Sequence, residues 1–391
     1  MLTFWYFFKL GFLLTYTSIC AGIAYWIYNG EKKYYEPIYV LKKTGEGKDD
    51  EKTVYLHDEF DEFARKDSPV SFMRIFFGTL TITLFKLFAS MSFAISLSFK
   101  LFNKMKKKEA KKENLTKEEI QQNIESTKFH TSSFLRFSGI FHFKIRLPDE
   151  EILPVYQKYF GPDYKIDYDG KFCCYICNHT SFNDILIAMA NYGCGFISKL
   201  DVKSYPIFGK IAQGLQSIFV DRSNPNSRKE VLDKIIERQK DYIEGKPVMP
   251  LMIFPEGTTT SGRHLLKFKR GAFYSLLPIK PQLILLDDDL DYSIGIGAGS
   301  PGFNYLRSLC YLGTRVNLCQ LPVIKPTDYM WEHYSHLGAE KWEIFAEVTR
   351  NIMCEIGKLQ PSNRTFRDSK HYENSLIKGK YHEENNDLLK V

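Results

Sequence analysis

The fold of this chain is decided by residues 172–190, which read FCCYICNHTSFNDILIAMA. The first six residues are apolar or small, as in a strand that is buried on both faces of a sheet. The last six, from Ile185 to Ala190, form an apolar run of helical character. A strand, a polar turn and a helix in this order form the repeating unit of a parallel α/β sheet.

The same alternation continues along the chain on the carboxyl side. Short apolar runs are separated by helical segments, of which residues 227–244 are the clearest. The apolar runs cover residues 195–197, 249–254 and 282–286. The pattern predicts an α/β fold over residues 129–367, with a mixed, largely parallel sheet flanked by helices.

A histidine and an aspartate occupy the polar turn between the first strand and its helix. Asp184 follows His179 five residues later, at the start of the helix. This spacing lets the carboxylate accept a hydrogen bond from one ring nitrogen, while the other nitrogen acts as a base. The spacing alone also fits a capped helix beside an ordinary surface histidine. We therefore treat His179 as a candidate catalytic base and Asp184 as the residue that orients it.

A second polar segment, MIFPEGTTTSGR at residues 252–263, follows another apolar run. Its glycine and its hydroxyl side chains can present N–H and O–H groups to a phosphate. The basic sequence KFKR follows at residues 267–270. A sheet-edge turn with solvated lysines is the alternative interpretation. The candidate binding residues here are Glu256, Gly257, Thr258 and Lys269.

An arginine lies at the polar end of the strand-like run 214–222. The planar guanidinium group of Arg222 suits bidentate contact with a phosphate, although a surface ion pair is the more common role of such an arginine. Further along, residues 277–281 read LPIKP, and the two prolines make a stiff entry into the next strand.

These four segments resemble, in order and spacing, the four sequence blocks of the glycerolipid (1-acylglycerol-phosphate type) acyltransferase superfamily. NHTSFND at 178–184 is similar to the NHxSxxD motif of that superfamily, and FPEGT at 254–258 is similar to its third block. Residues 219–222 and 278–281 resemble its second and fourth blocks. FPEGTTTSG followed by FKRGAF is most similar to lysophosphatidylcholine and lysophosphatidylethanolamine acyltransferases.

The resemblance, which covers residues 65–370, implies an acyl-CoA-dependent O-acyltransferase. Such an enzyme moves a fatty acyl chain from acyl-CoA to the free glycerol hydroxyl of a lysophospholipid. His179 would deprotonate that hydroxyl, and backbone donors near the same turn would stabilise the oxyanion. We expect no tightly bound cofactor and no metal ion. The acceptor phosphate would be held by Arg222, Glu256, Gly257, Thr258 and Lys269.

The expected partners are a phospholipid membrane, lysophospholipid and acyl-CoA. We expect no nucleic acid, and the sequence identifies no protein partner. Two alternatives stay open, namely a non-catalytic membrane or assembly subunit with the same fold, and a glycerol-3-phosphate or lysophosphatidate acyltransferase. We expect an integral membrane protein of the endoplasmic reticulum, with a mitochondrial membrane as the alternative location.

The amino-terminal stretch from Phe4 to Tyr28 is apolar and aromatic apart from Lys9. As a helix, this stretch is long enough to cross a bilayer core of about 30 Å. A cleavable signal peptide is the alternative, but the run is long for one and no basic segment precedes it. We therefore predict a transmembrane anchor over residues 1–30, followed by a polar linker over residues 31–69.

A second apolar block covers residues 70–103. Eight Lys and Arg residues lie in the preceding interval 31–69, and a lysine-rich run follows the block. Positively charged flanks favour the same face of a membrane, so a re-entrant or interfacial segment fits better than the alternative, a second transmembrane helix. A charged helical linker (104–128) and a polar tail (368–391) complete the predicted organisation.

The composition is compatible with these assignments. Of the 391 residues, 44% are hydrophobic and 15% aromatic, which excludes a wholly disordered chain. The formal net charge of +7 suits anionic phospholipid or coenzyme A, but it suits nucleic acid equally. The eight cysteines are irregularly spaced, which argues against a disulfide framework. We predict that the C-x-x-C pair Cys174 and Cys177 lies in a buried strand.

Overall fold

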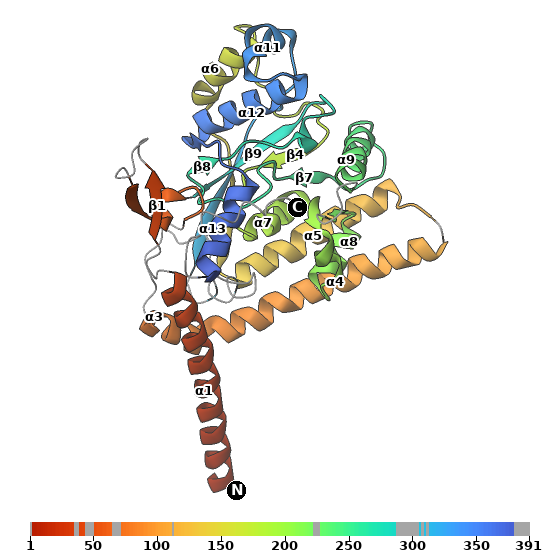
Figure 1. Cartoon of the computed structure of the whole chain (residues 1–391). Coiled ribbons are helices and arrows are strands. Elements are labelled where there is room, and N and C mark those ends of the chain that lie inside the picture. Colours follow the sequence, from red (N-terminus) through yellow and green to blue (C-terminus); the bar gives the residue numbers. More distant parts are fainter. Residues whose placement is uncertain are drawn as a thin grey trace.

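The centre of the computed structural model is a seven-stranded sheet in the order β3-β10-β9-β4-β7-β5-β6 (Figure 1). Every neighbouring pair is parallel except β10 and β9, which are antiparallel. This arrangement confirms the predicted α/β fold with a largely parallel sheet. The strands are β3 (Ile140–Ile145), β4 (Tyr175–Cys177), β5 (Gly195–Lys199), β6 (Ile218–Val220), β7 (Leu251–Ile253), β9 (Lys280–Leu286) and β10 (Thr314–Gln320).

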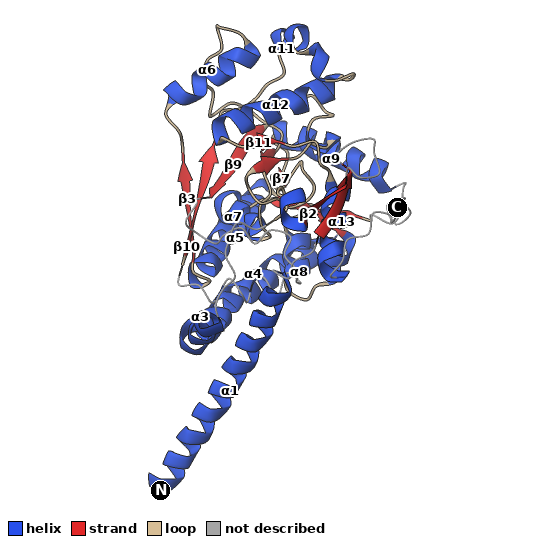
Figure 2. Ribbon diagram, turned by 60° about the vertical axis from the view of Figure 1, so that its left-hand side comes forward, coloured by secondary structure: helices blue, strands red, loops and turns tan. Residues whose placement is uncertain are grey.

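Successive side chains of the strands point into two separate cores. Ile176 and Leu283 lie in one core, whereas their chain neighbours Cys177 and Ile284 lie in the other. Because both faces of the sheet are buried, its strands read as continuous apolar runs in the sequence. Helices cover both faces (Figure 2). The first face is covered by α6 (Asp149–Phe160), α9 (Ser227–Ile243), α11 (Asp328–His333) and α12 (Lys341–Gly357), and the second by α4 (Leu84–Lys111), α5 (Lys117–Phe137), α7 (Asn183–Tyr192) and α8 (Phe208–Gly214).

The structure describes residues 2–34, 39–43, 51–64, 72–111, 113–221, 227–286, 305, 309 and 313–378. Within these ranges, seven cysteines are free and buried, including Cys174 and Cys177. The eighth, Cys310, lies outside the described residues. Cys177 ends the central strand β4 and Cys174 directly precedes it, and both buried thiols act as small apolar side chains.

The long helix α1 (Leu2–Tyr34) projects from the α/β domain (Figure 1). The chain returns along it in α3 (Phe72–Gly78) and the π-helix η1 (Thr79–Thr83), which run antiparallel to the carboxyl half of α1. The rings of Tyr28 and Phe72 lie 5.6 Å apart, and the Tyr16 hydroxyl donates to the Leu80 carbonyl at 2.6 Å. Twelve residues of helix rise about 18 Å, which is short of a bilayer core of about 30 Å.

After η1 the chain turns, and α4 runs across one side of the α/β domain, where it packs on α5 and α8 (Figure 1). Its inner side carries buried residues such as Leu97 and Leu101. Its outer side exposes large apolar side chains at helical spacing, namely Phe85, Phe88, Ile95 and Phe99. Two helical segments, residues 9–29 and 85–111, are long and apolar enough to cross a membrane.

Residues 51–64, predicted as part of a polar linker, contribute instead to the folded structure. Strand β2 (Glu51–Tyr55) pairs with β1 (Tyr39–Lys43), and α2 (Leu56–Glu59) follows. The Glu62 carbonyl accepts a hydrogen bond of 2.6 Å from the Ser261 amide of the α/β domain. The segment that precedes the second apolar block is therefore docked on the domain.

The polar tail predicted from residue 368 also differs from the observed structure. Residues 366–378 form helix α13 (Phe366–Lys378), which buries Tyr372 and Leu376 against Leu56, Phe60 and Phe63. The helix looks polar in sequence because only one narrow stripe of it is apolar.

We predict that the block after residue 70 re-enters the membrane and does not cross it. Residues 56–64 and helix α4 both pack on the α/β domain, so the two flanks of α3 and η1 lie on its side of the bilayer. Tags placed near residue 47 and at the carboxyl terminus should be equally accessible to protease in sealed microsomes. The amino terminus should lie on the opposite face, since positively charged residues follow α1. Tags found on opposite faces would show that the block crosses.

Candidate active site

His179 and Asp184 meet at the carboxyl end of β4, where the chain turns into α7. The His179 Nδ1 atom lies 2.9 Å from Asp184 Oδ2. The aspartate side chain is fully buried, whereas 15% of the histidine side chain is exposed. With Nδ1 bound to the carboxylate, the Nε2 atom is the one left to act as a base. The structure therefore brings together the two residues that the sequence spacing pairs.

The Asp184 carboxylate also orders the turn that carries His179. Its Oδ2 atom accepts hydrogen bonds from the backbone amides of Thr180 and Ser181, the latter at 2.8 Å. Its Oδ1 atom accepts a bond of 3.2 Å from the Thr180 hydroxyl. These contacts fix the carboxylate in the first turn of α7, so that the imidazole meets an acceptor that is already in place.

Two further contacts hold the histidine from other strands. The Asn178 side chain donates to the Ile284 carbonyl at 3.0 Å and accepts from the Ile284 amide at 2.7 Å, which ties the turn to β9. The imidazole of His179 stacks on the ring of Phe254, with 4.1 Å between the ring centroids. Neither role was assigned to Asn178 or Phe254 from the sequence, although both residues lie inside the recognised blocks.

Glu256 links the third block to the histidine turn. Its Oε1 atom accepts from the His179 amide at 2.8 Å and its Oε2 atom accepts from the Leu266 amide at 3.0 Å. The Thr260 amide in turn donates to the His179 carbonyl at 2.8 Å. Burial raises the pKa of Glu256 to about 8, against the effect of the two backbone hydrogen bonds. The described contacts of Glu256 are with backbone, so they position His179.

Gly257, Thr258 and Lys269 lie close together next to Glu256. The backbone of Gly257 is left-handed, with φ of 72°, and a Cβ atom there would collide with the Lys269 ammonium group. The Lys269 amide donates to the Pro255 carbonyl at 2.9 Å. Three of the predicted phosphate-binding residues are therefore neighbours. A fourth, Glu256, contacts backbone amides next to them, and the fifth, Arg222, lies outside the described residues.

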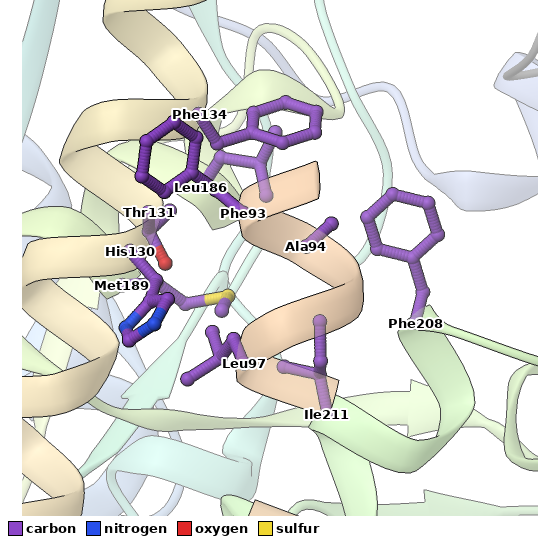
Figure 3. A pocket seen from close by; sticks show the side chains of 10 residues that line it. All are labelled: Phe93, Ala94, Leu97, His130, Thr131, Phe134, Leu186, Met189, Phe208 and Ile211. Carbon is purple, nitrogen blue, oxygen red and sulfur yellow. The ribbon is translucent and has the colours of Figure 1, made fainter. Parts of the chain in front are cut away.

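An apolar pocket lies behind the turn that carries His179, between α4, α5, α7 and α8 (Figure 3). Leu186 and Met189 line it from α7, the helix whose first turn contains Asp184. Apart from His130 and Thr131 its lining is apolar. In the described ranges of the chain, no group of three or more His, Cys, Asp or Glu side chains is arranged to hold a metal ion.

Comparison with known proteins places this site in a family. The family model for the acyltransferase domain matches residues 159–284. The lysophospholipid acyltransferase LPEAT1 of Arabidopsis thaliana is 29% identical over 202 residues, which are 51% of this chain and 48% of that protein. A lysophosphatidylcholine acyltransferase of Drosophila melanogaster is 32% identical over 197 residues, which are 49% of this chain and 34% of that protein. The chain thus spans half or less of the length of these curated relatives.

One solved structure is also similar. It is the crystal structure of the 1-acyl-sn-glycerophosphate (LPA) acyltransferase PlsC from Thermotoga maritima, which covers 70% of this chain and 94% of that chain. The two share 19% of their sequence, and the TM-score is 0.39. The family model thus identifies an acyltransferase domain over residues 159–284, and over about half of its length the chain is similar to lysophospholipid and lysophosphatidylcholine acyltransferases.

Proposed function

We propose that this chain is an integral membrane enzyme that moves a fatty acyl chain from acyl-CoA to the free glycerol hydroxyl of a lysophospholipid. The observation that carries the proposal is the bond between His179 Nδ1 and the buried Asp184 carboxylate. A partly buried imidazole held in this way has the arrangement of a general base. Relatives that align over about half of the chain are named as lysophospholipid or lysophosphatidylcholine acyltransferases, which favours this class of acceptor.

In the proposed reaction, His179 Nε2 removes the proton of the acceptor hydroxyl as its oxygen attacks the thioester carbonyl of acyl-CoA. The resulting tetrahedral intermediate expels the coenzyme A thiolate, and the imidazolium returns the proton to that sulfur. Asp184 fixes the imidazole tautomer and stabilises the imidazolium between these steps. The acceptor is acylated and free coenzyme A is released, so no other reactant is needed.

Three backbone amides of the histidine turn already have acceptors within the protein. The amide of His179 donates to Glu256, and the amides of Thr180 and Ser181 donate to Asp184. These three amides are therefore not available to the oxyanion. We infer that the charge is met by other groups around the turn.

The acceptor class is tested by lipid products. Purified chain, offered one acyl-CoA and a panel of acceptors, should form phospholipid from lysophosphatidylcholine or lysophosphatidylethanolamine faster than from glycerol 3-phosphate or lysophosphatidate. Preference for glycerol 3-phosphate or lysophosphatidate would mean that the chain is a glycerol-3-phosphate or lysophosphatidate acyltransferase. The absence of any product from folded protein would favour a non-catalytic membrane or assembly subunit. We propose the endoplasmic reticulum as its location, which fluorescence microscopy of a tagged chain would test against a mitochondrial membrane.

We predict that His179→Ala lowers the rate of acyl transfer by about 10² to 10⁴, because the base that activates the nucleophile is lost. Asp184→Asn should lower it as well, since an amide does not stabilise the imidazolium. His336→Ala is the matched control, because this histidine is exposed and lies outside the site. Steady-state kinetics on proteins with equal thermal unfolding midpoints would measure the effect. Near-normal activity of His179→Ala would contradict the mechanism.

We predict that Glu256 makes the stability of the protein dependent on pH. Because the folded pKa is raised from 4.5 to about 8, the folded state binds a proton more tightly than the unfolded state over this interval. The free energy of unfolding should therefore fall as the pH rises from about 4.5 to about 8. Glu256→Gln should remove this part of the dependence.

The same variant should destabilise the fold by about 1–3 kcal/mol. A glutamine oxygen can accept from one backbone amide, but its nitrogen cannot accept from the other, so either His179 or Leu266 loses a partner. Unfolding midpoints of both proteins in detergent at several pH values would check this. Parallel pH profiles for the wild type and the variant would mean that Glu256 does not titrate in this interval.

A further inference from the structure

Helix α13 covers the third block, although more than a hundred residues separate them in the chain. The Thr258 and Ser369 hydroxyl oxygens lie 2.9 Å apart. Ser369 is 1% exposed, whereas Thr258 is only partly buried. When the buried serine donates this bond, the Thr258 oxygen is the acceptor, and its own hydrogen is directed toward an outside acceptor. This direction of the bond makes Thr258 a donor to a ligand.

The same helix also contacts the basic residue of the predicted site. The Lys269 ammonium group lies 5.0 Å from the centroid of the Phe366 ring and beside the Cα atom of Gly257. An ammonium group over an aromatic face is attracted by the negative charge of the ring face. Phe366 therefore limits the positions that the long Lys269 side chain can take. The ammonium group thus lies beside Gly257, the residue that precedes Thr258 in the chain.

The position of α13 does not depend on these two contacts. Tyr372 packs on Phe60 and Phe63, with ring centroids 5.8 and 6.1 Å apart. The Arg364 guanidinium group, which precedes the helix, pairs with the Glu62 carboxylate at 3.1 Å. Residues 56–64 thus hold α13 in place, and the helix can act as a fixed support for the loop below it.

We propose that α13 completes a binding site for a phosphate ester, in which Ser369 orients the Thr258 hydroxyl and Phe366 positions the Lys269 ammonium group. The chemistry offered is one neutral donor and one cation, and the missing side chain of Gly257 leaves room for that cation beside Thr258. The inference deepens the proposed function and rests on it. Both the lysophospholipid and coenzyme A contain phosphate esters, so either could be the ligand.

Steady-state kinetics of the full-length chain in detergent test the role of Ser369. Ser369→Ala should raise the KM of one substrate, lysophospholipid or acyl-CoA, by about five- to tenfold, as for the loss of one hydrogen bond, with kcat within twofold. The substrate whose KM rises is the source of the phosphate. Ser369→Thr keeps a hydroxyl and should restore the KM. Phe366→Leu should have the same direction of effect as Ser369→Ala, and Phe366→Tyr should not.

Ser375→Ala is the matched control. Ser375 is 2% exposed on the same helix, but its hydroxyl donates only to the His371 carbonyl of that helix, at 2.9 Å. Its substitution should leave both KM values unchanged. Equal effects of the two serine variants, or a Ser369→Ala variant that changes neither KM, would overturn the proposal.

A second measurement does not need turnover. Glycerol 3-phosphate or coenzyme A should slow the reductive methylation of Lys269 in the wild type, read by mass spectrometry, with the exposed Lys267 as an internal reference. Ser369→Ala should abolish the protection. Protection in a protein that transfers no acyl chain would uphold the site and reject the proposed function. Equal methylation of Lys269 with and without both compounds would reject the site.

Discussion

The buried carboxyl group of Glu256 joins the two segments on which the site depends. Parallel pairing of β4 with β7 sets Ile176 beside Ile253. His179 lies three residues after Ile176, and Glu256 lies three residues after Ile253. The segments that follow β4 and β7 leave the sheet side by side. The Glu256 carboxyl group accepts hydrogen bonds from the amides of His179 and Leu266 and so links the two segments. Without that bridge, the turn that presents the imidazole would have one unpaired buried amide, which costs free energy.

The histidine turn, residues 178–184, is thereby held by several segments that are far apart in the sequence. Asn178 ties it to β9, and Asp184 anchors it to the first turn of α7. The opposite side of α7 packs toward α4, the helix whose outer face exposes phenylalanines. One short helix therefore lies between the reacting groups and the apolar surface of the protein. This arrangement suits substrates whose chains dissolve in lipid and whose reacting atoms are polar.

The parts of this structure that local pattern determines were predictable from the sequence. The β4 turn and α7 follow from an apolar strand, a polar loop and an apolar helix in direct succession, and the pairing of His179 with Asp184 needs only that loop. The docking of residues 56–64 and of α13 was not predictable, because it depends on contacts between the two ends of the chain. Helix α13 buries few apolar residues, so its sequence resembles a solvated tail. The backbone role of Glu256 was missed because a carboxylate beside lysines suggests a ligand contact, whereas its burial is visible only in three dimensions.

The docking of residues 56–64 has a consequence for the way in which substrates arrive. If α3 and η1 dip into the bilayer, the segments on both sides of them, residues 56–64 and α4, pack on the α/β domain. The depth of α3 and η1 in the bilayer then cannot change unless the domain moves with them. The distance between His179 and the lipid headgroups is then fixed by the protein. An enzyme held in this way draws its lipids from a single leaflet, and newly acylated phospholipid is returned to that same leaflet. Any balance of lipid number between the two leaflets must then be restored by a separate transport step.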